Sequence, residues 1–487
     1  MRGSKTVAII GAGMSGLAAA RLLCANGMTV QLFEANARVG GCCASTRLGG
    51  YLFNDGASYL AMPGMLDHLF HKLRLDRAEL LPLRRISSVQ TTRLPDGTVL
   101  RIDDGPEIAV DGTHGAAAAG DRIRTELAHF LAEWEPALRF FADDVLLHPL
   151  SMAHVIAKGW RHLVKLRGTV ASQLNRSFGS EAARAAFAGT LLYNGVPPER
   201  MPALALLGLV AILRDGCFLP EGGMGRIPEV LSDAVRAQSG SIHLNANVRR
   251  ILVKNGRAHA IDVENEGVVE TDAVISSVSA MHTYGSLLSV DEAPPRMRRK
   301  LQRVALSHKG FVLQLGLSNK IAVRSYANYV LPWMGEQSRL FQPGEDALRW
   351  PIYMVPTVSS PELAPPGGSI VEMFPSISQD IAPDDWSRAR KEEVAARAIE
   401  RLRRDYELDI SVQRILSPRE FQNDAHLYAG ALYGLSPAAG VRAFFQHRSP
   451  IQGLYQAGQT TWPGFGVVSA GLSGVFAAQA LLHDAVR

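Results

Sequence analysis

Short apolar runs alternate with longer stretches of helical periodicity along this chain. Residues 7–10 and 28–33 are apolar runs of strand length, and the Ala- and Leu-rich stretch between them has the spacing of a helix. Three further apolar runs predict strands at residues 241–248, 258–263 and 273–276. Strands that alternate with helices in this way predict an α/β fold with a parallel sheet.

The middle of the chain has a different pattern. Residues 123–213 are dominated by Ala, Leu and Arg at helical spacing, with prolines that interrupt the pattern. Residues 103–122 are rich in Gly, Ala and Asp and predict a turn-rich loop. Strands at 311–317 and 352–355 and an amphipathic helix at 388–406 follow. These elements predict a second unit, a sheet covered by helices.

A glycine motif joins the first predicted strand to the first predicted helix. Gly11 allows a tight turn, Gly13 lets a pyrophosphate approach the backbone, and Gly16 lets the helix pack closely. Glu34 ends the next strand, eighteen residues after Gly16, where a carboxylate can accept hydrogen bonds from ribose hydroxyls. GxGxxG alone is a weak signal, but the flanking strand, helix and acid together predict a dinucleotide site.

The residues after Glu34 favour a flavin over a nicotinamide. Ala35 to Gly41 resembles the E-x3-R-x-G-G extension of the FAD-dependent amine oxidase and carotenoid desaturase superfamily, with Arg38 and the pair Gly40-Gly41 in the motif positions. The resemblance implies that these residues continue the phosphate site. An Arg usually follows the paired glycines in that family, whereas this chain has Cys42 and Cys43.

Two later segments extend the resemblance. Residues 218–248 resemble the family section "P-x-G-G-x-G … L-x-x-x-V", which implies an adenine contact at the backbone of Val248. Residues 453–474 resemble the C-terminal motif of carotenoid desaturases, which implies flavin contacts near Gly458 and at the start of the last helix. Gln459 replaces the usual acid, and Phe465 replaces a small residue. The resemblance implies these cofactor-binding residues: Gly11, Gly13, Met14, Ser15, Gly16, Glu34, Ala35, Arg38, Gly40, Gly41, Val248, Gly458, Gln459, Gly466, Val467 and Val468.

The resemblance also implies a domain organisation. We predict a Rossmann-like FAD-binding domain built from the discontinuous segments 1–62, 218–300 and 418–487. We predict an α+β substrate domain from residues 63–217 and 301–417. Because no cysteine lies in the C-terminal motif, we predict that FAD binds non-covalently.

Composition and charge limit the functional classes. Four cysteines in 487 residues do not form a disulfide framework and favour the reduced cytoplasm. The net charge of +5 is scattered, with no aromatic-interleaved basic motif, so we expect no nucleic-acid partner. No signal peptide is evident, and the longest apolar block, 203–213, is too short to cross a bilayer. Residues 155–167 mix apolar and basic positions at helical spacing, as a core-packed helix or a membrane-surface helix would.

The predicted chemistry is hydride transfer from a hydrophobic polyene or isoprenoid-like substrate to flavin N5, as in the phytoene desaturase branch. We find no nucleophile, triad or metal-ligand cluster, and such a reaction needs none. Tyr193, Asn194, His426 and Tyr428 are candidates for the pocket wall. Three alternatives remain open: redox tailoring or cyclisation of another polyene metabolite, a flavin amine oxidase, and a non-catalytic prenyl-binding protein. The 7% aromatic content and the lack of an evident aromatic cage disfavour the amine oxidase.

Overall fold

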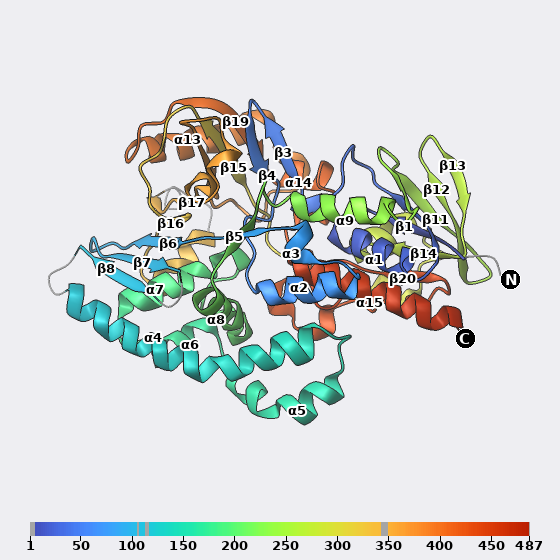
Figure 1. Ribbon diagram of the computed structural model, residues 1–487, viewed down its shortest axis with the longest axis horizontal. Helices are drawn as coiled ribbons and strands as arrows, with labels where there is room; N and C mark the ends of the chain where they lie inside the picture. Colours follow the sequence, from blue (N-terminus) through green and yellow to red (C-terminus); the bar gives the residue numbers. More distant parts are fainter. Residues whose placement is uncertain (1–4, 105–106, 113–115, 342–348, 487) are drawn as a thin grey trace.

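The computed structural model describes residues 5–104, 107–112, 116–341 and 349–486. Its two largest sheets lie at opposite ends of the molecule, with helices between and below them (Figure 1). The fold is mixed α/β, with one parallel sheet and one mixed sheet, as the sequence predicts. The two ends of the chain meet beside the parallel sheet, where Lys5 Nζ donates to the Ala485 carbonyl at 3.3 Å.

The parallel sheet has five strands in the order β10-β2-β1-β14-β20. Val7 and Ile9 of the central strand β1 are buried in one core, and Ala8 and Ile10 are buried in another, so both faces of the sheet are covered. The strands are β1 (Thr6–Ile10), β2 (Thr29–Phe33), β10 (Ser241–His243), β14 (Ala273–Ser276) and β20 (Leu454–Gln456).

Three helices and a small sheet cover these two faces. The helices are α1 (Met14–Cys24), α9 (Arg226–Arg236) and α15 (Val467–Val486), and they share the core of Val7 and Ile9. The small antiparallel sheet contains β11 (Val248–Lys254), β12 (Arg257–Val263) and β13 (Gly267–Glu270), and it packs on Ala8 and Ile10.

One strand predicted at 241–248 is two strands in the structure. β10 ends at His243 and β11 begins at Val248. Asn245 between them has a φ of 54°, and this left-handed conformation interrupts the extended chain.

The mixed sheet has eight strands in the order β19-β15-β18-β17-β16-β6-β7-β8, and only β16 and β6 pair in parallel. Phe311, Leu313 and Leu315 form its core with the helix α13 (Arg388–Arg403). The strands are β6 (Ser88–Arg93), β7 (Val99–Asp103), β8 (Ile108–Asp111), β15 (Val312–Leu317), β16 (Ala327–Val330), β17 (Ile352–Met354), β18 (Ser369–Met373) and β19 (Ile410–Leu416).

A layer of helices lies against this sheet and extends below the molecule in Figure 1. Trp134 and Phe187 are buried in this layer. The helices are α4 (Ala116–Arg139), which continues as a π-helix to Leu146, α5 (Met152–Lys165), α6 (Val170–Ser177), α7 (Glu181–Thr190) and α8 (Leu206–Asp215).

The prediction of a turn-rich loop at 103–122 is wrong for the part of this segment that the structure describes. Ile108 and Val110 of β8 are buried in the core, and α4 begins at Ala116. Alternating burial favours the strand, and the alanine run has a high helix propensity, so both features outweigh the turn residues. Residues 105–106 and 113–115 lie outside the described residues.

The remaining elements connect the two sheets. Two short antiparallel pairs and several helices belong to this group: β3 (Ser45–Leu48) with β4 (Tyr51–Asn54), β5 (Leu83–Arg85) with β9 (Phe218–Pro220), α2 (Pro63–Lys72), α3 (Arg77–Leu80), α10 (Ala280–His282), α11 (Pro295–Leu301) and α14 (Pro418–Asn423). The strands of the parallel sheet come from residues 6–33, 241–276 and 454–456. The division into two domains at residues 62, 217, 300 and 417 stays a prediction.

Candidate functional site

The turn between β1 and α1 has the geometry of a phosphate-binding loop. Gly11 has a φ of 93°, and a side chain at Gly16 would lie 1.9 Å from the Gly11 carbonyl oxygen, so both positions require glycine. A side chain at Gly13 would meet nothing within 4 Å. Gly13 is the N-cap of α1, where backbone N–H groups and the helix dipole favour an anion. The open space above Gly13 therefore fits a pyrophosphate.

The second glycine loop lies beside the first. Gly40 donates its backbone N–H to the Ala12 carbonyl at 2.8 Å and forms a β-bridge with Gly13. Gly40 and Gly41 have φ values of 118° and 54°, and a side chain at Gly41 would lie 3.6 Å from the Gly13 α-carbon. The two predicted phosphate loops thus form one glycine-lined surface.

Glu34 is buried at the end of β2, directly beneath these loops. Its two carboxylate oxygens accept hydrogen bonds from the backbone N–H of Ala12 at 2.7 Å and of Asn36 at 2.9 Å. The segment that leads into β11 lies beside Glu34, because the Ala246 N–H donates to the Glu34 carbonyl at 2.8 Å. Val248, two residues later, is buried at the start of β11. The ribose role of Glu34 and the adenine role of Val248 stay predictions.

Arg38 lies in an ion-pair cluster beside the loops. Its guanidinium donates to Asp55 at 2.7 Å, and Asp55 also accepts from Arg414 at 2.6 Å and from Thr46. Arg38 is half exposed, and exposed ion pairs contribute only about 0–1 kcal/mol, so Asp55 does not prevent contact with an anion. The predicted pyrophosphate contact of Arg38 stays a prediction.

A buried carboxyl group supports the same cluster from below. Glu372 accepts a hydrogen bond from Gln314 Nε2 at 3.0 Å, and Gln314 also donates to the Asn54 carbonyl and accepts from Arg414. Burial is the main cause that raises the pKa of Glu372 to about 7, from an ordinary value of 4.5.

This raised pKa predicts a stability loss as pH rises. Below pH 4.5 the carboxyl is protonated in both states, and between pH 4.5 and about 7 only the folded state keeps the proton, so the folded state loses relative stability. Glu372→Gln removes this titration. The free energy of unfolding of the variant, relative to that of wild type, is expected to rise by on the order of 2–3 kcal/mol from pH 4.5 to pH 8. Urea unfolding at the two pH values measures it. An advantage that does not change with pH would contradict the assignment.

The C-terminal motif brings a third glycine segment to the same place. Gly458 has a φ of 101° and donates its backbone N–H to Ser473 Oγ at 3.0 Å, and a side chain there would lie 3.5 Å from Ser15 Oγ. Gly466 has a φ of 105° and space around it, and Val467 begins the twenty-residue helix α15. Free N–H groups of this first turn suit the electron-rich edge of a flavin ring.

The positions of the other predicted residues follow from these elements. Met14 and Ser15 lie in the first turn of α1, and both are buried. Ala35 and Gln459 are half-buried, Val468 is buried in α15, and Gly434 contacts the Gln459 side chain. The structure thus gathers the predicted cofactor residues around α1, α15 and the ends of β1 and β2. Their individual contacts with FAD stay predictions.

Beyond the glycine loops, four tyrosines lie close to one another. Tyr59, Tyr193, Tyr329 and Tyr433 lie near enough to influence one another's pKa, and burial raises the pKa of all four. Nevertheless 38% of the Tyr193 side chain is accessible. Tyr193 can be both surrounded by protein and partly accessible if its accessible part faces a cavity that the protein encloses. We call these residues the tyrosine cluster.

This cluster is not predicted from the sequence. Its members come from four distant segments, so no local pattern could reveal it. Of the pocket candidates named from the sequence, the structure places Tyr193 in the cluster, with Asn194 buried beside it. Tyr428 instead packs edge-on against His282, at 5.3 Å between ring centroids. His426, like Ala429, has a positive φ in the segment around Tyr428.

Comparison with known proteins identifies the family. The profile of the flavin containing amine oxidoreductase family matches residues 14–482. The chain belongs to this family. It is 24% identical to a 4,4'-diapophytoene desaturase of a Methylomonas species, over 96% of this chain and 93% of that protein. It is 26% identical to a zeta-carotene-forming phytoene desaturase of Myxococcus xanthus, over 95% and 91% of the two chains.

Solved structures show the same fold. An oxidoreductase from Methanosarcina mazei superposes with a TM-score of 0.66 at 17% identity, over 98% of this chain and all of that chain. Putrescine oxidase with bound putrescine superposes with a TM-score of 0.63 at 18% identity, over 99% of both chains. These likenesses concern the fold.

Family membership implies FAD, and the residues of this flavin oxidoreductase fit that cofactor. The space above Gly13 and beside Gly41 leaves room for a pyrophosphate. The space at Gly466 leaves room for the edge of a flavin. When bound, FAD supplies a hydride acceptor. The chain's own residues would hold the pyrophosphate with backbone N–H groups, place the flavin by the first turn of α15 and enclose the reaction.

Proposed function

We propose that this flavin oxidoreductase is a desaturase or oxidase that removes a hydride from a hydrophobic polyene or isoprenoid-like substrate. The observation that carries this proposal is the uncharged surroundings of the tyrosine cluster. Within the described part of the chain, the groups that act on the pKa of the tyrosine cluster are other tyrosines, the thiols Cys42 and Cys217 and the amide of Asn194, none of them a carboxylate. A cationic amine would lose its water there without gaining a counter-charge, whereas an apolar chain carries no charge that must be desolvated.

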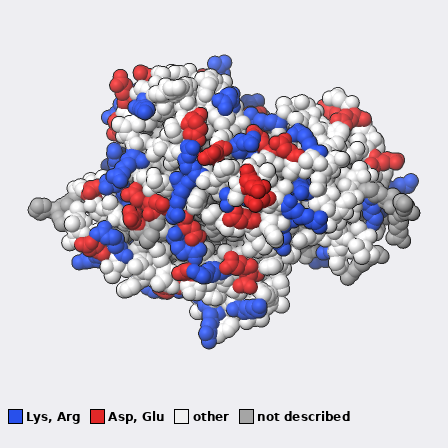
Figure 2. All heavy atoms as spheres, in the orientation of Figure 1, with Lys and Arg blue, Asp and Glu red and all other residues white. Residues whose placement is uncertain are grey.

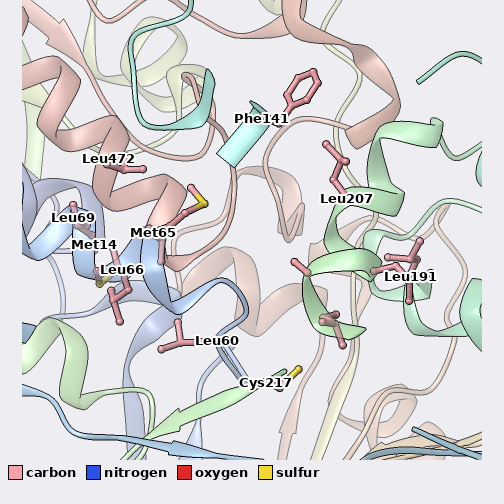
Figure 3. Packing of buried hydrophobic residues seen from close by; sticks show 14 of the residues in the cluster. Met14, Leu60, Met65, Leu66, Leu69, Phe141, Leu191, Leu207, Cys217 and Leu472 are labelled. Atoms are coloured by element: carbon pink, nitrogen blue, oxygen red, sulfur yellow. The ribbon is translucent and has the colours of Figure 1, made fainter. Parts of the chain in front are cut away.

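A packed apolar core from several elements surrounds this part of the molecule. Figure 3 shows Met65 and Leu66 of α2 with Leu472 of α15 on one side, and Leu191 and Leu207 of the helical layer on the other. The full-length relatives named as carotenoid desaturases support the same substrate class.

Product formation tests this proposal. Incubation of the FAD-loaded protein with phytoene in lipid vesicles and an added quinone is expected to give a polyene with longer-wavelength absorption. A matched reaction with putrescine and benzylamine, assayed for aldehyde and ammonia, tests the amine oxidase alternative, which the tyrosine cluster keeps open because aromatic faces also attract cations. Amine turnover with unchanged phytoene would refute the polyene proposal.

We also propose that FAD is held without a covalent bond. Burial raises the pKa of Cys42 to about 11 and that of Cys217 to about 12, so both thiols stay protonated and weakly nucleophilic. Acid precipitation of the holoprotein is expected to leave the flavin in the supernatant. A flavin that stays with the precipitate would contradict the proposal.

A membrane-facing helix fits a substrate that resides in lipid. Within the described residues no helix is both long and apolar enough to cross a membrane. Helix α5, however, carries an exposed apolar ridge at four-residue spacing, with exposed fractions of 46, 57, 56 and 50% for Met152, Ile156, Trp160 and Val164. The helix rests on the protein through Val155 and through Gly159, where a side chain would overlap the Phe140 ring.

Charge favours an anionic bilayer as the partner of this ridge. Lys158 and Arg161 are exposed beside it, and Arg167 follows the helix end. Helix α5 is the lowest element in Figure 1, and Figure 2 shows basic side chains at the same edge, whereas acidic and basic groups are interspersed over the rest of that face. Amphipathic helices with this arrangement bind the surface of anionic membranes.

Vesicle flotation tests this contact. The holoprotein is expected to float with vesicles that contain phosphatidylserine, and Ile156→Glu with Trp160→Glu is expected to weaken this binding about tenfold or more. Val268→Glu is the matched control, because Val268 is 61% exposed on β13. Equal flotation of wild type and the α5 variant would contradict the bilayer as partner, and a shift from dimer to monomer in that variant would assign the ridge to a second copy.

A further inference from the structure

Three phenol groups of the tyrosine cluster lack a hydrogen-bond partner in the protein. Among the described residues, the hydroxyls of Tyr59, Tyr329 and Tyr433 make no hydrogen bond. All three hydroxyl oxygens keep some solvent-accessible surface. They therefore open onto accessible space. Two other interior phenols are paired, since Tyr326 donates to the Ser58 carbonyl at 2.6 Å and Tyr353 donates to Tyr406 at 2.9 Å.

A histidine without a partner lies beside these phenols. His308 Nδ1 is buried and makes no hydrogen bond within the described residues. The His308 ring fills the space that a side chain at Gly195 would occupy, and Gly195 follows Tyr193 and Asn194 in the chain. The centroid of the His308 ring is 5.5 Å from that of the Tyr433 ring. Burial lowers the pKa of His308 to about 4, so the imidazole is neutral. Because Nδ1 is sealed from solvent, His308 places an uncharged ring beside the phenols, and this nitrogen does not itself reach the accessible space.

The cluster lies beside the C-terminal glycine motif. The Tyr433 ring packs on Phe465 at 4.4 Å between centroids, and Phe465 lies between Gly464 and Gly466 of the C-terminal motif. Tyr59 follows the Asp55 turn, which Arg38 contacts. Unpaired phenol groups therefore lie beside the motif for which flavin contacts are predicted.

Unpaired polar groups in a cavity disfavour a pure hydrocarbon. A hydrocarbon that enters would displace water from the phenols and leave them without partners, which lowers its affinity. A hydroxyl or carbonyl oxygen would replace that water with direct hydrogen bonds. Sites built to bond an oxygen discriminate strongly against the analogue that lacks it.

We propose that the phenol groups of the tyrosine cluster bind an oxygen atom of the substrate. The preferred substrate is then a polyene or isoprenoid with a hydroxyl or carbonyl group near the bond that is oxidised. This inference rests on the proposed function for the polyene character of the substrate and adds the oxygen group.

Equilibrium binding to a matched pair of polyenes tests the proposal. The pair is retinol and axerophthene, which differ by one hydroxyl group, and binding to the FAD-loaded protein is followed by the perturbation of the flavin spectrum. Wild type is expected to bind retinol about tenfold or more tighter than axerophthene. Tyr329→Phe with Tyr433→Phe is expected to remove most of this preference by weakening retinol binding and leaving axerophthene binding unchanged.

The controls separate a binding role from a structural one. Axerophthene affinity in the double variant reports the integrity of the cavity, and Tyr353→Phe removes a phenol outside the cluster and is expected to keep the preference. Equal wild-type affinity for the two polyenes, or an equal loss of both in the double variant, would overturn the proposal. If polyenes bind with the expected preference but none is oxidised, the proposed function is contradicted and the proposed oxygen-binding site stands.

Discussion

Gly13→Val is expected to abolish FAD binding and to leave the fold intact. A side chain at Gly13 meets no protein atom within 4 Å, and its φ of −73° suits any residue, so the substitution causes no strain. The valine would instead occupy the space where the glycine loops leave room for the pyrophosphate. We expect FAD affinity to fall roughly 100-fold or more, measured by titration of the apoprotein.

The neighbouring glycine provides a contrasting variant. At Gly16 a side chain would lie 1.9 Å from the Gly11 carbonyl oxygen, so Gly16→Val disrupts the turn itself and is expected to lower the thermal stability of the apoprotein. Gly64→Val, at an open position in α2, is expected to change neither property. If Gly13→Val bound FAD as tightly as wild type, the phosphate site could not lie above Gly13.

Gly474→Ala is expected to be the most destabilising single methyl addition between the cofactor helices. Helices α1 and α15 cross so closely that the added carbon would lie 2.0 Å from the Ser15 carbonyl oxygen and 2.8 Å from its carbonyl carbon. Backbone atoms of a buried helix cannot yield locally, so the helices must separate. We expect a loss of about 3 kcal/mol in the free energy of unfolding and weaker FAD binding.

Gly471→Ala is the matched control in the same helix. Its added carbon would lie 2.5 Å from Leu69 Cδ2, the end of a flexible side chain, which can rotate away. We expect a loss of only about 1 kcal/mol, measured by urea denaturation of both variants under the same conditions. Equal losses at the two positions would show that the helix crossing is not the tight contact we describe.

The sequence predicts the cofactor side of this protein far better than the substrate side. The glycine loops are runs of neighbouring residues, and their φ values and close approaches require glycine, so a local pattern identifies them. The pairing of Gly13 with Gly40 also follows from the βαβ layout, because successive parallel strands end at the same edge of the sheet.

Long-range contacts limit the rest. Tyr59, Tyr193, Tyr329 and Tyr433 meet only after two sheets and a helical layer have assembled, and no spacing in the sequence connects them. The strand β8 was hidden for a related reason, since its four residues follow a stretch dominated by turn formers and are buried by tertiary packing. Which apolar helix face stays exposed, as in α5, likewise depends on neighbours such as Phe140.

The most direct test of the central claim is the anaerobic visible spectrum of the FAD-loaded protein during addition of polyenes in detergent. The glycine loops predict a flavin spectrum, and the uncharged surroundings of the tyrosine cluster predict that a polyene bleaches it by reducing the flavin. A flavin that stays oxidised with every polyene but bleaches with an amine would contradict the proposed substrate class. A protein that takes up no flavin after reconstitution with FAD would contradict the account of the site and favour a prenyl-binding protein.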